Sequence, residues 1–179
     1  MSSFALADSS ARCVSRSATR IALTPVERGW SHRRYSILRE VLGPDFHGPS
    51  SSHTAAPQLI ALEARRLLDG VPSFAKVKLF NSFATTGEGH RTQIAIVAGL
   101  LGIKTTDPRT PDAMAIARQN DLAVTFEKHQ DAAEHPNTLE LELQGGSILV
   151  RMKGISIGGG NFEIVEKKRG SALAEGRLQ

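Results

Sequence analysis

The spacing of apolar residues along the chain predicts three helices. Residues 55–68 repeat apolar side chains at helical intervals and stop before Gly70. Further helices are predicted at residues 90–101 and 107–120. In the last of these, Thr110 is a candidate N-cap, because the proline after it suits the first position of a helix.

Alternation of polar and apolar residues predicts a strand at residues 76–80, and less regular runs predict four more. These later strands are expected at residues 122–126, 138–143, 147–152 and 161–165. Two glycines between the third and fourth strands, at positions 145 and 146, indicate a hairpin. The pattern predicts an α+β fold with a mostly antiparallel sheet and helices packed on one side.

One folded domain is expected at residues 35–167, since a chain of 179 residues has little room for two. It would begin with a short helix or strand at residues 35–42. Residues 1–34 are rich in Ser and Arg, and we expect a disordered or mobile basic extension there, with an organelle transit peptide as the less favoured alternative. Residues 168–179 lose the apolar pattern and are expected to form a frayed tail.

Composition narrows the possible partners. The formal net charge is +4, but much of the excess lies near the two ends, and only 5% of the residues are aromatic, so nucleic-acid binding is not expected. No run of about 20 apolar residues is present, and none is expected to cross a membrane. Cys13 is the only cysteine, which suits the reducing cytoplasm and is too few for an iron-sulfur cluster held by this chain. No metal ligand is therefore assigned.

Two loops share one composition, in which small and hydroxyl residues surround or precede a histidine just before a predicted helix. In the first loop, His53 is surrounded by Ser50, Ser51, Ser52 and Thr54. In the second, His90 follows Ser82, Thr85, Thr86, Gly87 and Gly89. Glycine lets the backbone approach a ligand, and the free N–H groups at a helix start favour an anion, so each loop is a candidate site for a carboxylate or phosphate.

Helix capping is the simpler interpretation of either loop alone, because Ser and Thr are preferred N-caps. The presence of two such loops, each with a histidine, favours a site, since histidine changes its charge near neutral pH. Neither loop has the Gly-Lys-Ser or Gly-Lys-Thr of a phosphate-binding loop. A third segment, the glycines at 158–160, indicates either a bulge in the sheet or close approach of a ligand.

Five motifs in order resemble those of the β part of iron-sulfur-dependent L-serine dehydratases. They are Gly48-Pro49-Ser50-Ser51-Ser52-His53-Thr54-Ala55, Ser82-Phe83-Ala84-Thr85-Thr86-Gly87-Glu88-Gly89-His90, Ala98-Gly99-Leu100-Leu101-Gly102, His135-Pro136-Asn137-Thr138 and Ser156-Ile157-Gly158-Gly159-Gly160. The match spans residues 35–166. This β part also resembles an allosteric substrate-binding domain of some phosphoglycerate dehydrogenases.

The resemblance implies the lyase reaction that converts L-serine to pyruvate and ammonia. It implies an α subunit that holds a four-iron four-sulfur (4Fe-4S) cluster, with one iron acting as a Lewis acid on the serine hydroxyl. The β part would face that subunit across the active site and would be inactive alone. We assign His53 and His90 as catalytic. The expected substrate-binding residues are Ser50, Ser51, Ser52, Thr54, Ser82, Thr86 and Gly87.

Two positions depart from the family pattern. The family usually has an acidic residue where this chain has Gln93, and a second glycine where this chain has Ala56. Many β subunits also continue into a regulatory domain for which this chain has no room. The alternative hypothesis is a stand-alone serine-binding or regulatory module without catalysis. A homodimer is possible in either case.

Overall fold

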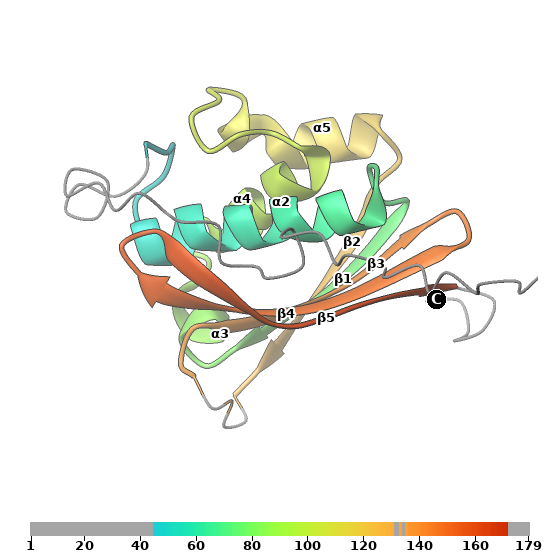
Figure 1. Ribbon diagram of the computed structural model, residues 1–179. Coiled ribbons are helices and arrows are strands. Elements are labelled where there is room, and N and C mark those ends of the chain that lie inside the picture. The colour runs from blue at the N-terminus through green and yellow to red at the C-terminus, as the bar shows by residue number, and fades with distance from the viewer. Residues whose placement is uncertain (1–44, 131–132, 134, 172–179) are drawn as a thin grey trace, which may run out of the picture. The chain divides into compact units, whose positions relative to one another are not determined.

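The computed structural model describes residues 45–130, 133 and 135–171 (Figure 1). The helices are α2 (Ala56–Leu68), α3 (Ser82–Thr86), α4 (Thr92–Leu101) and α5 (Ala113–Gln119). The strands are β1 (Phe74–Phe80), β2 (Ala123–His129), β3 (Thr138–Gly145), β4 (Ile148–Gly158) and β5 (Asn161–Ser171). Residues 1–34, and the segment 35–42 predicted as a helix or strand, lie outside the described residues.

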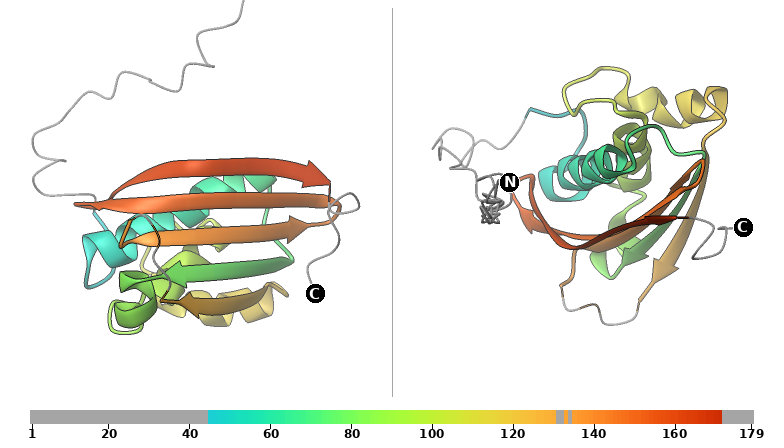
Figure 2. Two further views of the ribbon diagram at one scale, coloured as in Figure 1. Left: turned by 90° about the horizontal axis from the view of Figure 1, so that it is seen from below. Right: turned by 45° about the vertical axis from the view of Figure 1, so that its right-hand side comes forward.

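The strands form one sheet in the order β2-β1-β3-β4-β5. Only the β1–β2 pair is parallel, and the other three pairs are antiparallel. Parallel neighbours need a long connection, and here α3, α4 and α5 lie in the segment between β1 and β2. Figure 1 shows α2, α4 and α5 on one face of the sheet. In the left view of Figure 2, the strands lie in front and the helices behind them. The predicted α+β fold with a mostly antiparallel sheet is confirmed.

The two faces of the sheet differ because successive side chains of a strand point to opposite sides. On the helix side, Val77 pairs with Leu141 and Leu141 pairs with Met152, and all three are buried. On the other face, Lys78, Glu140 and Lys153 are aligned in the same way and form ion pairs of 3.9 and 3.8 Å. The core therefore lies between the sheet and the helices.

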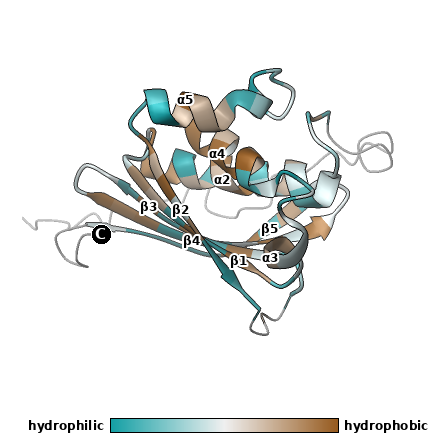
Figure 3. Cartoon of the chain, turned by 180° about the vertical axis from the view of Figure 1, so that it is seen from behind, coloured by the Kyte–Doolittle hydropathy of each residue, from teal (hydrophilic) through white to brown (hydrophobic). Residues whose placement is uncertain are grey.

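Beyond Thr92 and Gln93, helix α4 consists of apolar residues and glycine, in keeping with the brown ribbon at its label in Figure 3, because it packs between α2 and α5. Its approach to α2 is close at Gly99, where a Cβ atom would lie 2.3 Å from the carbonyl oxygen of Gln58. Neither α4 nor any other described helix combines the length and apolarity needed to span a membrane. Because Gly99 has no side chain, the backbones of α2 and α4 can approach each other there.

Several element boundaries differ from the predicted ones. The predicted third helix is divided into a 3₁₀ turn at Thr110–Asp112 and the shorter α5, and Arg109 instead of Thr110 precedes the turn. The five-residue α3 was not predicted. The predicted hairpin is confirmed, since Gly145 pairs with Ile148.

The expectation of a frayed tail from residue 168 is wrong for its first four residues, because β5 continues to Ser171. Lys168 pairs with Arg151, and Ser171 pairs with Ile148. The strand lies at the edge of the sheet and exposes most of its side chains, so it needs no apolar alternation. Residues 172–179 lie outside the described part of the chain.

Candidate functional site

The first histidine loop folds into a π-helical turn, Ser51–Ala55, that leads directly into α2. The amide of Ala55 donates to the carbonyl oxygen of Ser50, five residues earlier, at 3.3 Å. Ser50 is the N-cap, and its hydroxyl accepts a bond from the amide of His53 at 3.1 Å. Such turns are rare and often occur at functional sites. The turn and its cap fix the backbone that carries His53.

The second loop begins where β1 ends, at a strained residue. Asn81 has φ 46° and ψ −111°, which residues other than glycine seldom adopt. Its amide donates to the carbonyl oxygen of His129, and the amide of Ser82 donates to that of Pro136. The sharp turn at Asn81 places Ser82 at the start of α3.

Each nitrogen of the His53 ring contacts a serine hydroxyl, one from its own loop and one from the second loop. Nδ1 lies 2.9 Å from the Ser52 hydroxyl, and Nε2 lies 2.8 Å from the Ser82 hydroxyl. The Ser52 hydroxyl in turn lies 3.3 Å from that of Ser50. A neutral imidazole donates from one nitrogen and accepts at the other, so one serine donates to the ring and the other accepts. We call these four residues the serine-histidine chain.

His90 lies against the His53 ring, with centroids 4.7 Å apart and planes tilted by 44°. Burial, and then the nearby charge of His90, lower the pKa of His53 from its ordinary value of 6.5. Phe83 contacts the same ring edge to face at 5.2 Å. The Nδ1 atom of His90 is buried and has no hydrogen-bond partner among the described residues. His53 is therefore held neutral near pH 7, as a proton acceptor must be.

Two buried threonines tie the loops together. The Thr54 hydroxyl donates to the carbonyl oxygen of His90 at 2.7 Å, and the Thr92 hydroxyl donates to that of His53 at 2.6 Å. Both side chains are almost fully buried. Thr54 was predicted to bind substrate, but its hydroxyl is already engaged. Thr92 was not predicted, because a single threonine at a helix start gives no signal of a long-range bond.

The remaining predicted site residues differ in solvent exposure and in the contacts they make. Ser51 is partly exposed, and its carbonyl oxygen accepts a bond from Ala56. The Thr86 hydroxyl donates to the carbonyl oxygen of Ser82 at 2.8 Å within α3. Gly87 is buried, and a Cβ atom there would lie 2.4 Å from the carbonyl oxygen of Phe83. The structure thus brings His53, His90 and Ser82 together, whereas Thr86 and Gly87 make contacts within their own loop.

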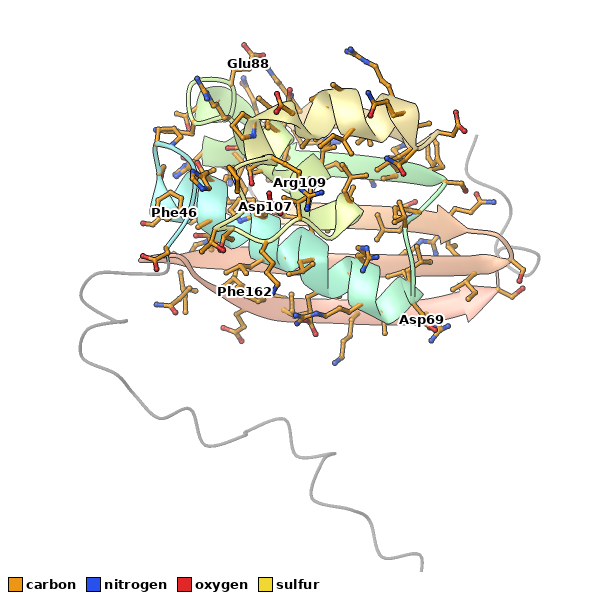
Figure 4. The ribbon with its side chains drawn as sticks, turned by 90° about the horizontal axis from the view of Figure 1, so that it is seen from above. Phe46, Asp69, Glu88, Asp107, Arg109 and Phe162 are labelled. Carbon is orange, nitrogen blue, oxygen red and sulfur yellow. The ribbon has the colours of Figure 1, made fainter. Side chains whose placement is uncertain are left out.

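A cavity of about 180 Å³ adjoins the two loops. Its lining residues are His47, Gly48, Thr54, Arg91, Ile94, Ala95, Thr110 and Pro111. Nearby, Arg109 donates to Asp107 from its guanidinium and its amide, and with a smaller contribution from His47 this lowers the pKa of Asp107 to about 2 (Figure 4). Glu88 projects from the outer side of the second histidine loop in the same view. The ionised Asp107 thus fixes the backbone at Arg109, next to Thr110 and Pro111 in the cavity wall.

The donor set of this chain does not suit an iron-sulfur cluster. Such clusters are held mainly by cysteine thiolates, and the single cysteine, Cys13, lies outside the described residues. Within residues 45–130, 133 and 135–171, no three or more His, Cys, Asp or Glu side chains are grouped so as to hold a metal ion.

Comparison with known proteins gives matches across the domain that carries both loops. Residues 46–120 match the family described as serine dehydratase beta chain. The probable L-serine dehydratase beta chain of Bacillus subtilis is 38% identical over 133 residues, 74% of this chain and 60% of that protein. The L-serine dehydratase beta chain of Peptoniphilus asaccharolyticus is 36% identical over 130 residues, 70% of this chain and 58% of that protein.

A longer protein named L-serine dehydratase, from Mycobacterium tuberculosis, is 31% identical over 150 residues, which is 70% of this chain and 32% of that protein. The chain thus spans somewhat under two thirds of the two beta chains it matches and about a third of the longer relative. The matched family segment, residues 46–120, contains both histidines and the serines around them. On this agreement of sequence and motif, residues 46–120 of the chain match the serine dehydratase beta chain family, and the chain is similar to beta chains of that name over about 70% of its length.

Proposed function

We propose that this chain is the β subunit of an L-serine dehydratase, which converts L-serine to pyruvate and ammonia in the cytoplasm with an iron-sulfur α subunit. The observation that carries the proposal is the serine-histidine chain, in which a neutral His53 lies between two serine hydroxyls and against His90. The names of the relatives support the same reaction.

The reaction removes water across the Cα–Cβ bond of serine. A base takes the α-proton, the β-hydroxyl leaves as hydroxide or water, and the resulting enamine tautomerises and hydrolyses to pyruvate and ammonia. His53 is our candidate for the base, because a ring with a lowered pKa is unprotonated at neutral pH. Both ring nitrogens of His53 form hydrogen bonds with serine hydroxyls. A bound substrate would therefore displace one hydroxyl or exchange a proton through it.

Ser52 and Ser82 are the candidates for substrate contact, since both are partly exposed and each touches the His53 ring. Ser50 supports Ser52 and caps the π-helical turn. His90 is the candidate for the second proton-transfer group, because its ring lies next to His53. The 4Fe-4S cluster is assigned to the α subunit, because one cysteine cannot hold it here.

The test is co-expression with a candidate α subunit from the same genome, purification without oxygen, and measurement of pyruvate formed from L-serine. The assembled enzyme should be active, and this chain alone should be colourless and inactive. His53→Ala and His90→Ala should each lower kcat by roughly 100-fold or more. His129→Ala serves as the control, because that ring stacks on Phe80 and pairs with Glu127.

Normal turnover in both His53→Ala and His90→Ala would refute the site assignment. Iron and sulfide bound to the isolated chain, together with turnover, would refute the division between subunits. If the chain alone binds L-serine in calorimetry and no α subunit restores turnover, the alternative of a serine-binding regulatory module is correct. Sedimentation of the chain alone would also test the possible homodimer.

A further inference from the structure

The two threonines beside the histidines form a reciprocal brace between the loops. Thr54 follows His53 in the sequence but bonds the carbonyl oxygen of His90, at 2.7 Å. Thr92 lies two residues after His90 but bonds the carbonyl oxygen of His53, at 2.6 Å. Each histidine backbone is therefore held by a hydroxyl from the opposite loop.

Each loop is also closed on itself at the same threonine. The amide of Thr54 donates to the carbonyl oxygen of Ser50, and the amide of Thr92 donates to that of Gly87, both at 2.8 Å. The threonine side chains are 1% and 0% exposed, so water does not compete for their hydroxyls. The brace thus links two locally fixed turns.

We propose that Thr54 and Thr92 are positioning residues of this site, which set the separation of the two imidazoles by holding each histidine backbone from the opposite loop. The inference rests on the proposed function, because it gives the brace a role in a reaction that uses His53 and His90. The rings are 4.7 Å apart, close enough for a shift of about 1 Å to matter, and such a shift at reacting groups costs up to about 100-fold in rate.

The expected signature is a loss of kcat that follows the hydroxyl. In the assembled enzyme, Thr92→Val removes the hydroxyl at nearly constant volume, and we expect kcat to fall by about 10- to 100-fold while KM changes much less. Thr92→Ser keeps the hydroxyl and should restore most of kcat. Thr54→Val and Thr54→Ser should behave in the same way.

Thr110→Val is the matched control for the loss of a buried bond. Thr110 is also buried, and its hydroxyl donates to the carbonyl oxygen of Asp107 at 2.9 Å instead of to that of a histidine. This variant should lose stability but retain kcat. A loss of kcat in Thr110→Val equal to that in Thr92→Val would overturn the proposal, because general loosening would then explain both.

A second measurement uses the full chain without its partner. Burial, and then the nearby charge of His90, lower the pKa of His53, so releasing the brace, which opens the loops and separates the rings, should move the NMR titration midpoint of His53 toward that of a free histidine. The serine variants should leave the midpoint in place. An unchanged midpoint and unchanged kcat in both valine variants would overturn the proposal, and so would failure of both to fold, since the hydroxyls would then serve stability alone.

The outcomes separate this inference from the proposed function. If His53→Ala and His90→Ala leave turnover intact, the function assigned to the site fails, whatever the threonines do. If those variants abolish turnover and the valine variants do not, the function stands and only the positioning role fails.

Discussion

The hydroxyl of Ser82 lies 2.8 Å from Nε2 of His53, although the two residues are 29 positions apart in the sequence and belong to different elements. Ser82 opens α3, whereas His53 lies in the π-helical turn before α2. The contact unites two loops that look like separate helix starts in the sequence. It also commits one nitrogen of His53 to this serine.

We expect Ser82→Ala to lower kcat of the assembled enzyme by about 10- to 100-fold, because His53 would lose the partner that orients its ring and passes its proton. Steady-state measurement of pyruvate formation tests this. Thr85→Val is the control from the same helix, since the exposed Thr85 hydroxyl bonds the backbone oxygens of Asn81 and Ser82. Equal activity of Ser82→Ala and Thr85→Val would remove Ser82 from the site.

The lowered pKa of His53 predicts a loss of stability toward acid. The unfolded chain has an ordinary histidine and binds a proton as the pH falls through about 6.5, whereas folded His53 resists protonation until a lower pH. Its contribution is therefore intact above pH 6.5 and is lost progressively below that value. The acid limb of activity should lie below 6.5 for the same reason.

Thermal unfolding of the full chain, measured between about pH 8 and pH 5, checks this sign when wild type is compared with His53→Gln. The variant lacks the titrating group, so the difference in melting temperature should shift in its favour as the pH falls. A constant difference across that range would show that His53 has the same pKa in both states.

Asn81→Gly should stabilise the protein by about 1 kcal/mol. The backbone strain at φ 46° and ψ −111° costs roughly 1 to 3 kcal/mol for a residue with a side chain, and glycine removes it at an entropic cost of about 0.5 to 1 kcal/mol. Asn81→Ala keeps the strain and is the comparison. Urea unfolding of the three proteins measures the free energies. A glycine variant less stable than the alanine variant would contradict this account of the turn.

Gly99→Ala should destabilise the protein by about 2 kcal/mol. The added methyl would lie 2.3 Å from the Gln58 carbonyl oxygen and 2.8 Å from Cβ of Ala61, so α2 and α4 must separate. The better helix propensity of alanine, about 1 kcal/mol, offsets only part of that cost. Gly70→Ala is the control, since its Cβ would meet nothing within 4 Å. Comparable unfolding free energies for both variants would contradict the close packing of these helices.

The regular elements could be predicted because their residues have one dominant environment. Helix α2 buries one side, with Ile60, Ala61 and Ala64 at helical spacing, and β1 alternates buried and half-buried residues along its whole length. The end of β5 could not be predicted in this way. Its charged residues face solvent at a sheet edge, where strand formation depends on hydrogen bonding to β4 instead of on an apolar pattern.

The site was predictable in its members but not in its geometry. Histidine and serine loops can be identified from composition, so His53, His90 and Ser82 were candidates. Their union depends on the turn at Asn81 and on the packing of α2 against α4, both of which are tertiary. The same limit explains Thr54 and Thr92, whose hydroxyls bond carbonyl groups 36 and 39 residues away. Nothing local distinguishes such a threonine from an ordinary helix cap.

The parallel pairing of β1 with β2 places Ser82 and His90 inside one long connection, residues 81–122, which includes α3, α4 and α5. The two ends of this connection meet at the sheet. Closing a loop of that length costs chain entropy before its contacts compensate, so the segment gains order only as β2 docks. Within the sheet, β2 pairs with β1 alone, whereas β3 and β4 each have neighbours on both sides. In hydrogen exchange, we therefore expect the amides of residues 81–92 to lose protection together with β2 and before β3 and β4, so that the contact between Ser82 and His53 would be lost on heating before the fold itself.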